Sequence, residues 1–255
     1  MITIRQSKII QSAKETFGYL QDIIYPPRCA VCGHACKEVG MVCGKCRNVF
    51  SLVRQPVCLK CGKQISLPEK EYCYDCLKKR FHYVRGFPVF NYDENVKRSI
   101  SQFKYHNKKE YAVYYARSIY ARFGDEIKRT RASYFVPVPV HKSRLKKRGY
   151  NQAKVLCDEL SKLTGIPVLD GFLIRNKKTL PQKELNDLER LKNLSQAFET
   201  IKSNDIINKE GIETVMLVDD IYTTGSTIEA CTLALMKAGV KQVFYTGIAI
   251  GKGYQ

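Results

Sequence analysis

One segment specifies the type of domain to expect: Val215-Met-Leu-Val-Asp-Asp-Ile-Tyr-Thr-Thr-Gly-Ser-Thr227. Its first four residues are apolar and β-branched at both ends, which predicts a buried strand of a parallel sheet. Two acids, Asp219 and Asp220, come next, followed by a turn of small hydroxylated residues and an apolar-periodic helix. In an open α/β sheet, ligands bind at the carboxyl ends of the strands. The segment therefore predicts an α/β fold and marks its ligand site.

The chemistry of this segment suits a sugar phosphate. Backbone N–H groups and hydroxyls can surround a phosphate where a loop enters a helix. The residues available for this are Thr223, Thr224, Gly225, Ser226 and Thr227. The carboxylates of Asp219 and Asp220 repel a phosphate but accept hydrogen bonds from sugar hydroxyls. The alternative is an ordinary strand–turn–helix in which Thr and Ser only cap the helix, although a cap needs a single such residue.

The segment resembles the phosphoribosyl-pyrophosphate (PRPP) motif of type I phosphoribosyltransferases. The resemblance implies that Asp219 and Asp220 hold the ribose hydroxyls at the catalytic centre and that the Thr-rich loop holds the 5′-phosphate. It also implies an open, mostly parallel sheet with flanking helices, and Mg²⁺ bound together with PRPP. The segment lacks the Gly-Lys-Ser/Thr ending of a P-loop and does not match a dinucleotide-binding fingerprint.

A basic segment follows an earlier predicted strand: Val136-Pro-Val-Pro-Val-His-Lys-Ser-Arg-Leu-Lys-Lys-Arg-Gly-Tyr-Asn-Gln152. Phosphoribosyltransferases place their pyrophosphate loop at this point, so the resemblance implies pyrophosphate binding here. Pyrophosphate is a dense anion that basic side chains and backbone amides can hold. The candidate residues are His141, Lys142, Arg144, Lys147 and Arg148. The alternative is a solvated basic turn.

Eight of the eleven cysteines form four Cys-x-x-Cys pairs, which predict two tetrahedral zinc sites. The ligands are Cys29, Cys32, Cys43, Cys46, Cys58, Cys61, Cys73 and Cys76. We favour two sequential ribbons, with an interleaved cross-brace as the alternative. Cys36 or His34 in place of Cys32 is a further alternative. A disulfide scaffold is less consistent with metal-type spacing and with an N-terminus that lacks a secretory pattern. A segment so poor in aliphatic residues needs metal to fold, so the zinc is expected to be structural.

The chain is strongly basic, with 43 Lys and Arg against 24 Asp and Glu and a formal charge of +19. Each four-thiolate zinc site carries −2, and two such sites lower this total to about +15. Such a charge favours polyanionic partners such as nucleic acid, without sequence preference. The alternative is general solubility together with a phosphate-rich substrate. No stretch approaches the roughly 18 apolar residues of a membrane span.

The chain divides into three expected regions. Residues 1–27 predict an amphipathic helix that docks on the protein itself or contacts a membrane surface or partner. Residues 28–80 form the double zinc ribbon, and residues 81–255 form the phosphoribosyltransferase-like domain. In that domain we expect strands at 87–92, 134–140, 168–174, 215–218 and 243–250, with helices at 94–103, 110–123, 153–163 and from the motif to about 238. The second strand contains two prolines and should lie at a sheet edge. The polar stretch 175–193 predicts a mobile active-site loop.

The double ribbon, the Pro-Val-Pro…Arg-Gly-Tyr-Asn-Gln segment, the polar loop and the Asp-Asp…Thr-Thr-Gly-Ser-Thr motif together resemble the ComF family of competence proteins. This resemblance implies a cytoplasmic role in natural transformation, with handling of imported single-stranded DNA and contact with other DNA-import proteins. The basic and aromatic segments 78–85, with Phe81 and Tyr83, and 103–111 are candidate surfaces for base stacking.

Three functional classes remain open at this stage. The first is an enzyme that transfers a phosphoribosyl group from PRPP to an unknown acceptor. This class includes a transferase that serves only nucleoside metabolism and has no DNA role. The second is a binding protein that retains the PRPP pocket and acts on single-stranded DNA. The third is a PRPP-sensing regulator on DNA. No residue declares itself as a general base, so the sequence alone does not decide between turnover and binding.

Overall fold

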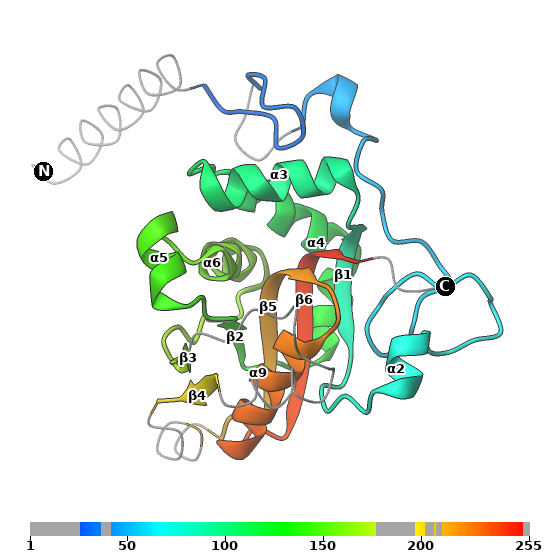
Figure 1. Cartoon of the computed structure of the whole chain (residues 1–255), viewed down its shortest axis with the longest axis vertical. Coiled ribbons are helices and arrows are strands. Elements are labelled where there is room, and N and C mark those ends of the chain that lie inside the picture. Colours follow the sequence, from blue (N-terminus) through cyan, green and yellow to red (C-terminus); the bar gives the residue numbers. More distant parts are fainter. Residues whose placement is uncertain (1–25, 37–41, 177–196, 202–206, 208–210, 252–255) are drawn as a thin grey trace, which may run out of the picture.

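The computed structural model describes residues 26–36, 42–176, 197–201, 207 and 211–251. The helix expected at 1–27 and most of the mobile loop expected at 175–193 lie outside the described residues. The described part of the chain builds a parallel sheet with helices on both faces and a cysteine-rich region that passes along the β1 edge of the sheet (Figure 1).

The central sheet has four strands in the order β1-β6-β5-β2, and every neighbouring pair is parallel. The strands are β1 (Gly86–Asn91), β2 (Tyr134–Pro137), β5 (Thr214–Tyr222) and β6 (Gln242–Ile250). Strand β5, which carries the acid pair, lies in the interior of the sheet between β6 and β2. As expected from its prolines, β2 lies at the end of this order, and among the described residues only an isolated parallel bridge between Phe135 and Val168 lies beyond it.

Helices cover the two faces of the sheet because side chains alternate along each strand. Met216, Val218 and Ile248 point to one face and pack with α3 (Glu94–Tyr105), α4 (Tyr111–Arg129) and α6 (Gln152–Thr164). Val215, Leu217 and Tyr245 point to the other face and pack with α9 (Ser226–Lys237). The fold prediction of an open, mostly parallel sheet with flanking helices is thus confirmed (Figure 1).

Two local expectations were wrong. The basic segment after β2 is a short helix, α5 (Lys142–Arg148), rather than a loop. The strand expected at 168–174 is regular only as β3 (Leu173–Arg175), which pairs antiparallel with β4 (Phe198–Thr200) in a separate two-stranded sheet. Strand β4 was not expected, because its partner β3 lies on the other side of the polar stretch in the sequence. Local periodicity does not indicate such a pairing.

The described residues of the cysteine-rich region contain little regular structure beyond a 3-10 turn, η1 (Gly44–Cys46), and the helix α2 (Tyr74–Lys78). The region nevertheless contacts the sheet closely. The N–H of Val53 donates to Val89 O at 2.9 Å, the N–H of Asn91 donates to Ser51 O at 2.8 Å, and Leu52 forms an antiparallel bridge with Phe90. A segment between the two ribbons therefore pairs with the outer side of β1 and protects a sheet edge that would otherwise be open.

Candidate functional site

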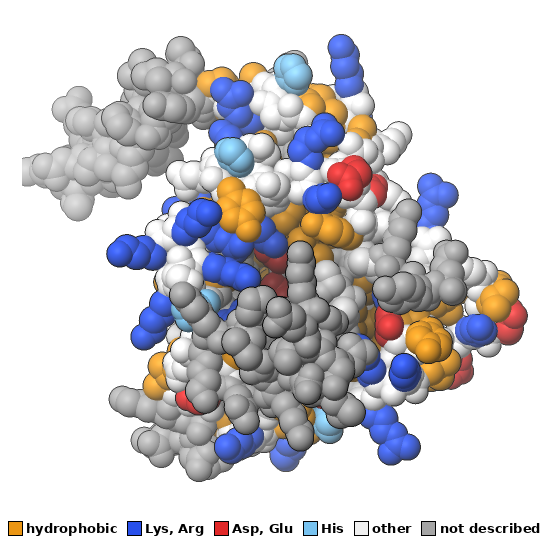
Figure 2. All heavy atoms as spheres, viewed as in Figure 1, with side chains coloured by type: hydrophobic (Ala, Val, Ile, Leu, Met, Phe, Trp, Pro, Cys, Tyr) orange, Lys and Arg blue, Asp and Glu red, His pale blue; other side chains and the backbone are white. Residues whose placement is uncertain are grey.

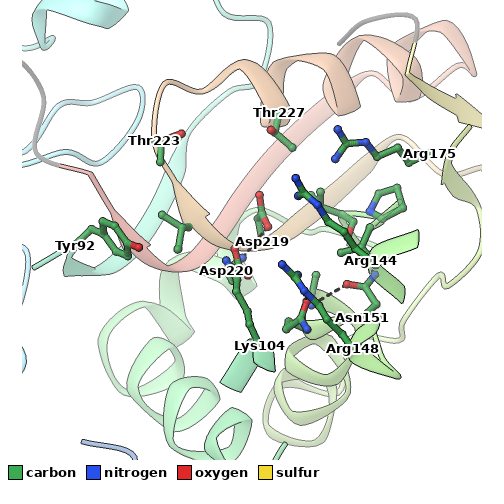
Figure 3. A pocket seen from close by; sticks show the side chains of 16 residues that line it. Tyr92, Lys104, Arg144, Arg148, Asn151, Arg175, Asp219, Asp220, Thr223 and Thr227 are labelled. Carbon is green, nitrogen blue, oxygen red and sulfur yellow. Dashed lines mark hydrogen bonds and ion pairs between the residues drawn. The ribbon is translucent and has the colours of Figure 1, made fainter. Parts of the chain in front are cut away.

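A cavity of about 240 Å³ opens at the carboxyl ends of β5 and β2 (Figure 3). Six of the residues predicted as site residues line it: Asp219, Asp220, Thr223, Thr227, Arg144 and Arg148. The other predicted residues, Thr224, Gly225, Ser226, His141, Lys142 and Lys147, are not among its lining residues. The two segments that resemblance assigned to one ligand thus contribute to a single cavity although they lie far apart in the sequence.

Neighbouring cations compensate the negative charges of the acid pair only in part. Asp220 forms an ion pair with Lys104 Nζ at 2.7 Å, and both side chains are largely buried. The backbone N–H of Asp220 donates to Asp219 Oδ1 at 2.8 Å. Burial raises the pKa of Asp219 to about 7, and the negative charge of Asp220 adds to this, while Lys104 and Arg175 oppose it only in part. Desolvation penalises the charged form of a carboxyl group, so Asp219 titrates near neutral pH.

The loop after β5 enters α9 through Gly225, which has φ +80° and ψ −9° in the left-handed region. Among the residues that the structure describes, no side chain caps this helix, and the hydroxyls of Thr224 and Ser226 instead lie 3.0 Å from each other. The ordinary-cap alternative is therefore not what the structure shows. The N–H groups of the first helical turn have no intrahelical acceptors, and a phosphate is a suitable partner for them.

The helix α5 presents two arginines to the cavity. Arg144 and Arg148 are four residues apart and so lie on one face of the helix, where both line the cavity. Arg148 donates to Gln152 Oε1 at 2.9 Å and to the hydroxyl of Tyr105 at 2.9 Å. His141 serves as the N-cap, because its Nδ1 accepts from the N–H of Ser143 at 3.1 Å. The helical geometry explains why only two members of the basic segment reach the cavity.

Sequence reasoning missed Lys104 and Arg175 as site residues, although both line the cavity (Figure 3). Lys104 lies in the last turn of α3 and Arg175 ends β3. With Arg144 and Arg148 they supply four positive charges against the two acids, an excess of two when both acids are ionised. This excess suits a polyanionic ligand that also carries hydroxyls. Arg175 opens the stretch 175–193 that was expected to form an active-site loop, but neither residue was singled out, because each is one basic residue among many in the chain.

The eight paired cysteines form two clusters whose sulfur atoms lie within 4.8 Å of one another. One contains Cys29, Cys32, Cys43 and Cys46, and the other contains Cys58, Cys61, Cys73 and Cys76. The sequential arrangement is confirmed, and neither Cys36 nor His34 belongs to a cluster. Sulfur atoms about 3.8 Å apart are what four Zn–S bonds of about 2.3 Å require. The Sγ atoms of Cys32 and Cys43 are 3.7 Å apart and those of Cys61 and Cys73 are 3.6 Å apart, so both clusters fit structural zinc.

The fold is that of a phosphoribosyltransferase-like α/β protein, and it carries a double zinc ribbon. Residues 20–77 match the family model of the double zinc ribbon domain. Competence protein F of Haemophilus influenzae is 34% identical over 179 residues, which is 69% of this chain and 76% of that protein. Competence protein ComFC of Streptococcus pneumoniae is 31% identical, over 61% of this chain and 63% of its own length. DNA utilization protein YhgH of Escherichia coli is 28% identical, over 66% and 73%.

The chain belongs to the ComF family, and the family prediction is confirmed. These relatives are named for competence and for DNA utilization. Within the part of the chain that the structure describes, no helix combines the length and apolar character needed to cross a membrane.

Proposed function

We propose that the cavity binds Mg²⁺-PRPP. Asp219 and Asp220 accept hydrogen bonds from the ribose hydroxyls, and the loop 223–227 surrounds the 5′-phosphate. The pyrophosphate lies toward Arg144 and Arg148 of α5. The observation that carries this proposal is that one cavity joins an acid pair to an excess of cations from α3, α5 and β3 (Figure 3). A ligand that carries both phosphate groups and sugar hydroxyls can interact with the cations and with the acid pair at the same time.

The same geometry suits phosphoribosyl transfer. The acceptor would attack the anomeric carbon of the ribose, and the bonding electron pair would leave with pyrophosphate. Arg144 and Arg148 would stabilise the charge that develops on the leaving group, and the acids would orient the sugar. Mg²⁺ would be held mainly by the pyrophosphate and water, and would neutralise part of the same charge. Binding of PRPP without turnover would use the same contacts.

The test of the pocket is the double variant Asp219→Ala with Asp220→Ala, measured by calorimetric titration with Mg²⁺-PRPP. We expect this variant to lose measurable PRPP binding. It should retain two zinc ions and the circular dichroism spectrum of the folded protein. The matched control is Asp158→Ala with Glu159→Ala, another adjacent acid pair, whose members form ion pairs with Lys154 and Lys162 on α6, away from the cavity lining. Equal PRPP affinity in the acid-pair variant and the wild type would refute the assignment.

We further propose that the chain binds single-stranded DNA without base preference, as a protein of competence and DNA uptake. The support is the charge of +19 and the names of its relatives. On the face shown in Figure 2, Lys and Arg side chains outnumber acidic ones. The expectation that Phe81 and Tyr83 stack bases is wrong, because both rings are buried in the core. Phe103 and Tyr111 are buried as well.

Exposed rings of the second ribbon replace the buried ones as candidates. Tyr74 is 60% exposed on α2, and Lys78 Nζ lies 5.9 Å from its ring centroid. Replacing Lys78, Lys79 and Arg80 by Ala should reduce the slope of log affinity against log salt by up to about 2, at about 0.7 per phosphate contact on a single strand. Tyr74→Ala should weaken binding at an unchanged slope, because stacking releases no counterions. A slope that the triple variant leaves unchanged would place the DNA contact elsewhere.

A further inference from the structure

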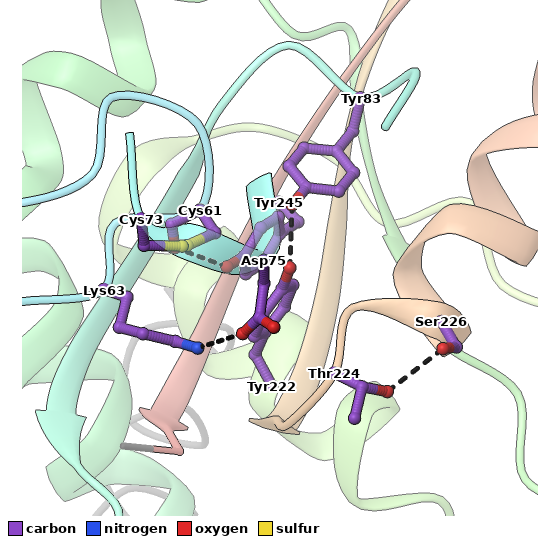
Figure 4. Close-up of polar contacts among 9 residues, drawn as sticks. All are labelled: Cys61, Lys63, Cys73, Asp75, Tyr83, Tyr222, Thr224, Ser226 and Tyr245. Atoms are coloured by element: carbon purple, nitrogen blue, oxygen red, sulfur yellow. Dashed lines mark hydrogen bonds and ion pairs between the residues drawn. The ribbon is translucent and has the colours of Figure 1, made fainter. Parts of the chain in front are cut away.

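Three buried tyrosines lie between the second zinc ribbon and the loop 223–227 (Figure 4). Tyr83, Tyr222 and Tyr245 are at most 4% exposed. The hydroxyl of Tyr245 donates to the carbonyl of Cys61 at 2.6 Å, and the hydroxyls of Tyr83 and Tyr222 lie 2.8 Å apart. The rings of Tyr222 and Tyr245 stack with their centroids 5.0 Å apart, and Tyr83 meets Tyr245 edge-on at 5.3 Å. A backbone atom of a zinc ligand is thereby connected to the end of β5.

The tyrosine cluster supports the loop directly at Gly225. A Cβ at this position would lie 2.3 Å from the Tyr222 hydroxyl oxygen and 2.9 Å from Cζ of Phe81. The left-handed glycine therefore rests on these two rings, and Phe81 itself stacks on Tyr83. Since Gly225 is the N-cap of α9, the position of these rings fixes where the first-turn N–H groups of that helix lie.

A second contact joins the same two regions. Glu229 is 2% exposed in the first turn of α9, and its Oε2 accepts from the backbone N–H of His82 at 2.9 Å. The Nδ1 atom of His82 meets the other carboxylate oxygen. Residues 81–83 follow the last zinc ligand, Cys76, by only a few positions. The chain that leaves the zinc site is thus fixed both to β5 and to α9.

The first ribbon has no such connection among the described residues. Its Ala30 and Phe50 pack in the core on the opposite face of the sheet, with α3 and α4, and the carbonyl of Ala30 accepts from the hydroxyl of Ser99. The two zinc sites therefore differ in the parts of the domain that they contact. The second site adjoins the loop after β5, and the first adjoins the helices of the opposite face.

We propose that the second zinc ribbon positions the loop 223–227 for phosphate binding, with Tyr83, Tyr222 and Tyr245 as the positioning residues. The inference rests on the proposed PRPP site. Metal-dependent folding of this ribbon fixes the Cys61 carbonyl and residues 81–83, and the tyrosines transmit that placement to Gly225. If the ribbon does not hold these groups in place, a buried tyrosine hydroxyl loses its acceptor and the loop loses its support. Ligand binding is then weaker, because the loop must become ordered at the same time.

The sharpest variant is Tyr245→Phe, which removes one hydroxyl and retains the stacked ring. Loss of one buried hydrogen bond should weaken the binding of PRPP and of ribose 5-phosphate by about 3- to 10-fold. Pyrophosphate alone should bind as to the wild type, because α5 lies outside the tyrosine cluster. The matched control is Tyr115→Phe, which removes another fully buried hydroxyl, bonded to Ser99, in the core of the opposite face. We expect this control to leave all three affinities unchanged.

Hydrogen exchange of residues 222–230 in the ligand-free protein supplies a readout that does not depend on PRPP. Exchange there should be faster in Tyr245→Phe and in Cys76→Ser than in Tyr115→Phe and in the first-ribbon variant Cys32→Ser. Equal exchange and equal affinities in Tyr245→Phe and Tyr115→Phe would overturn the inference. Equal weakening of pyrophosphate and ribose 5-phosphate binding would also overturn it, because it would indicate general destabilisation. Absence of PRPP binding by the wild type would refute the proposed function, while the exchange comparison would still decide the role of the ribbon.

Discussion

Replacing Asp219 by Asn should stabilise the ligand-free protein at alkaline pH. Folding raises the pKa of this carboxyl from the ordinary 3.8 to about 7, so the folded state binds the proton more tightly than the unfolded state. Its contribution to stability therefore falls as the pH rises from about 4 through about 7. The difference between the two pKa values corresponds to a loss of about 4 kcal/mol in the free energy of unfolding above pH 7, at about 1.4 kcal/mol per pKa unit. Water in the open cavity screens part of this, so we expect a gain of about 2–4 kcal/mol at pH 8.

The pH dependence of this gain is the decisive measurement. Urea unfolding of wild type and Asp219→Asn at pH 5 and pH 8 should show a gain at pH 5 of about half that at pH 8. The amide retains an Oδ1 acceptor for the N–H of Asp220, which keeps that hydrogen bond in place. Zinc–thiolate protonation affects both proteins equally and cancels in the difference. A gain that is the same at both pH values, or a loss of stability at pH 8, would refute the reasoning.

Two other predictions follow from single observations. Gly225→Ala should abolish PRPP binding, because the added Cβ would lie 2.3 Å from the Tyr222 hydroxyl in a backbone conformation that disfavours alanine; calorimetry that shows wild-type affinity would contradict the placement of the loop. Metal analysis should return two zinc ions per chain, and one in Cys58→Ser. This variant should also lower the melting temperature of the α/β core, because Cys58 packs in the same buried cluster as Leu217 and Tyr222. A Cys58→Ser protein with one zinc and an unchanged melting temperature would show that the ribbon and the sheet are energetically independent.

The features that were predictable from the sequence are those specified by neighbouring residues. The strand, acid pair and loop of 215–227 are contiguous, and the two cysteines of each pair are only three positions apart. The helix α5 escaped prediction because its segment has one apolar residue, Leu145, which is itself 42% exposed. An amphipathic pattern needs a buried face, and α5 has none.

Burial of aromatic rings was the other property that the sequence did not reveal. Phe81 and Tyr83 lie among basic residues, a pattern that fits an exposed stacking surface as well as a buried hinge. Their burial depends on β5, β6 and α9, whose residues are more than 130 positions away in the chain. Such contacts are tertiary, and no local periodicity reports them.

The two ends of the proposed ligand site differ in how they are built. The sugar and 5′-phosphate end comes from one continuous segment that passes from β5 into α9, supported from behind by buried tyrosines. The pyrophosphate end comes from Arg144 and Arg148 on the short helix α5, which has no buried residue. A contiguous loop that is supported by buried rings keeps its geometry when the surrounding elements shift, whereas side chains on a separate short helix move with that helix. Small movements of α5 should therefore alter the hold on the pyrophosphate before they alter the hold on the sugar, and in a transferase the pyrophosphate is the group that must leave.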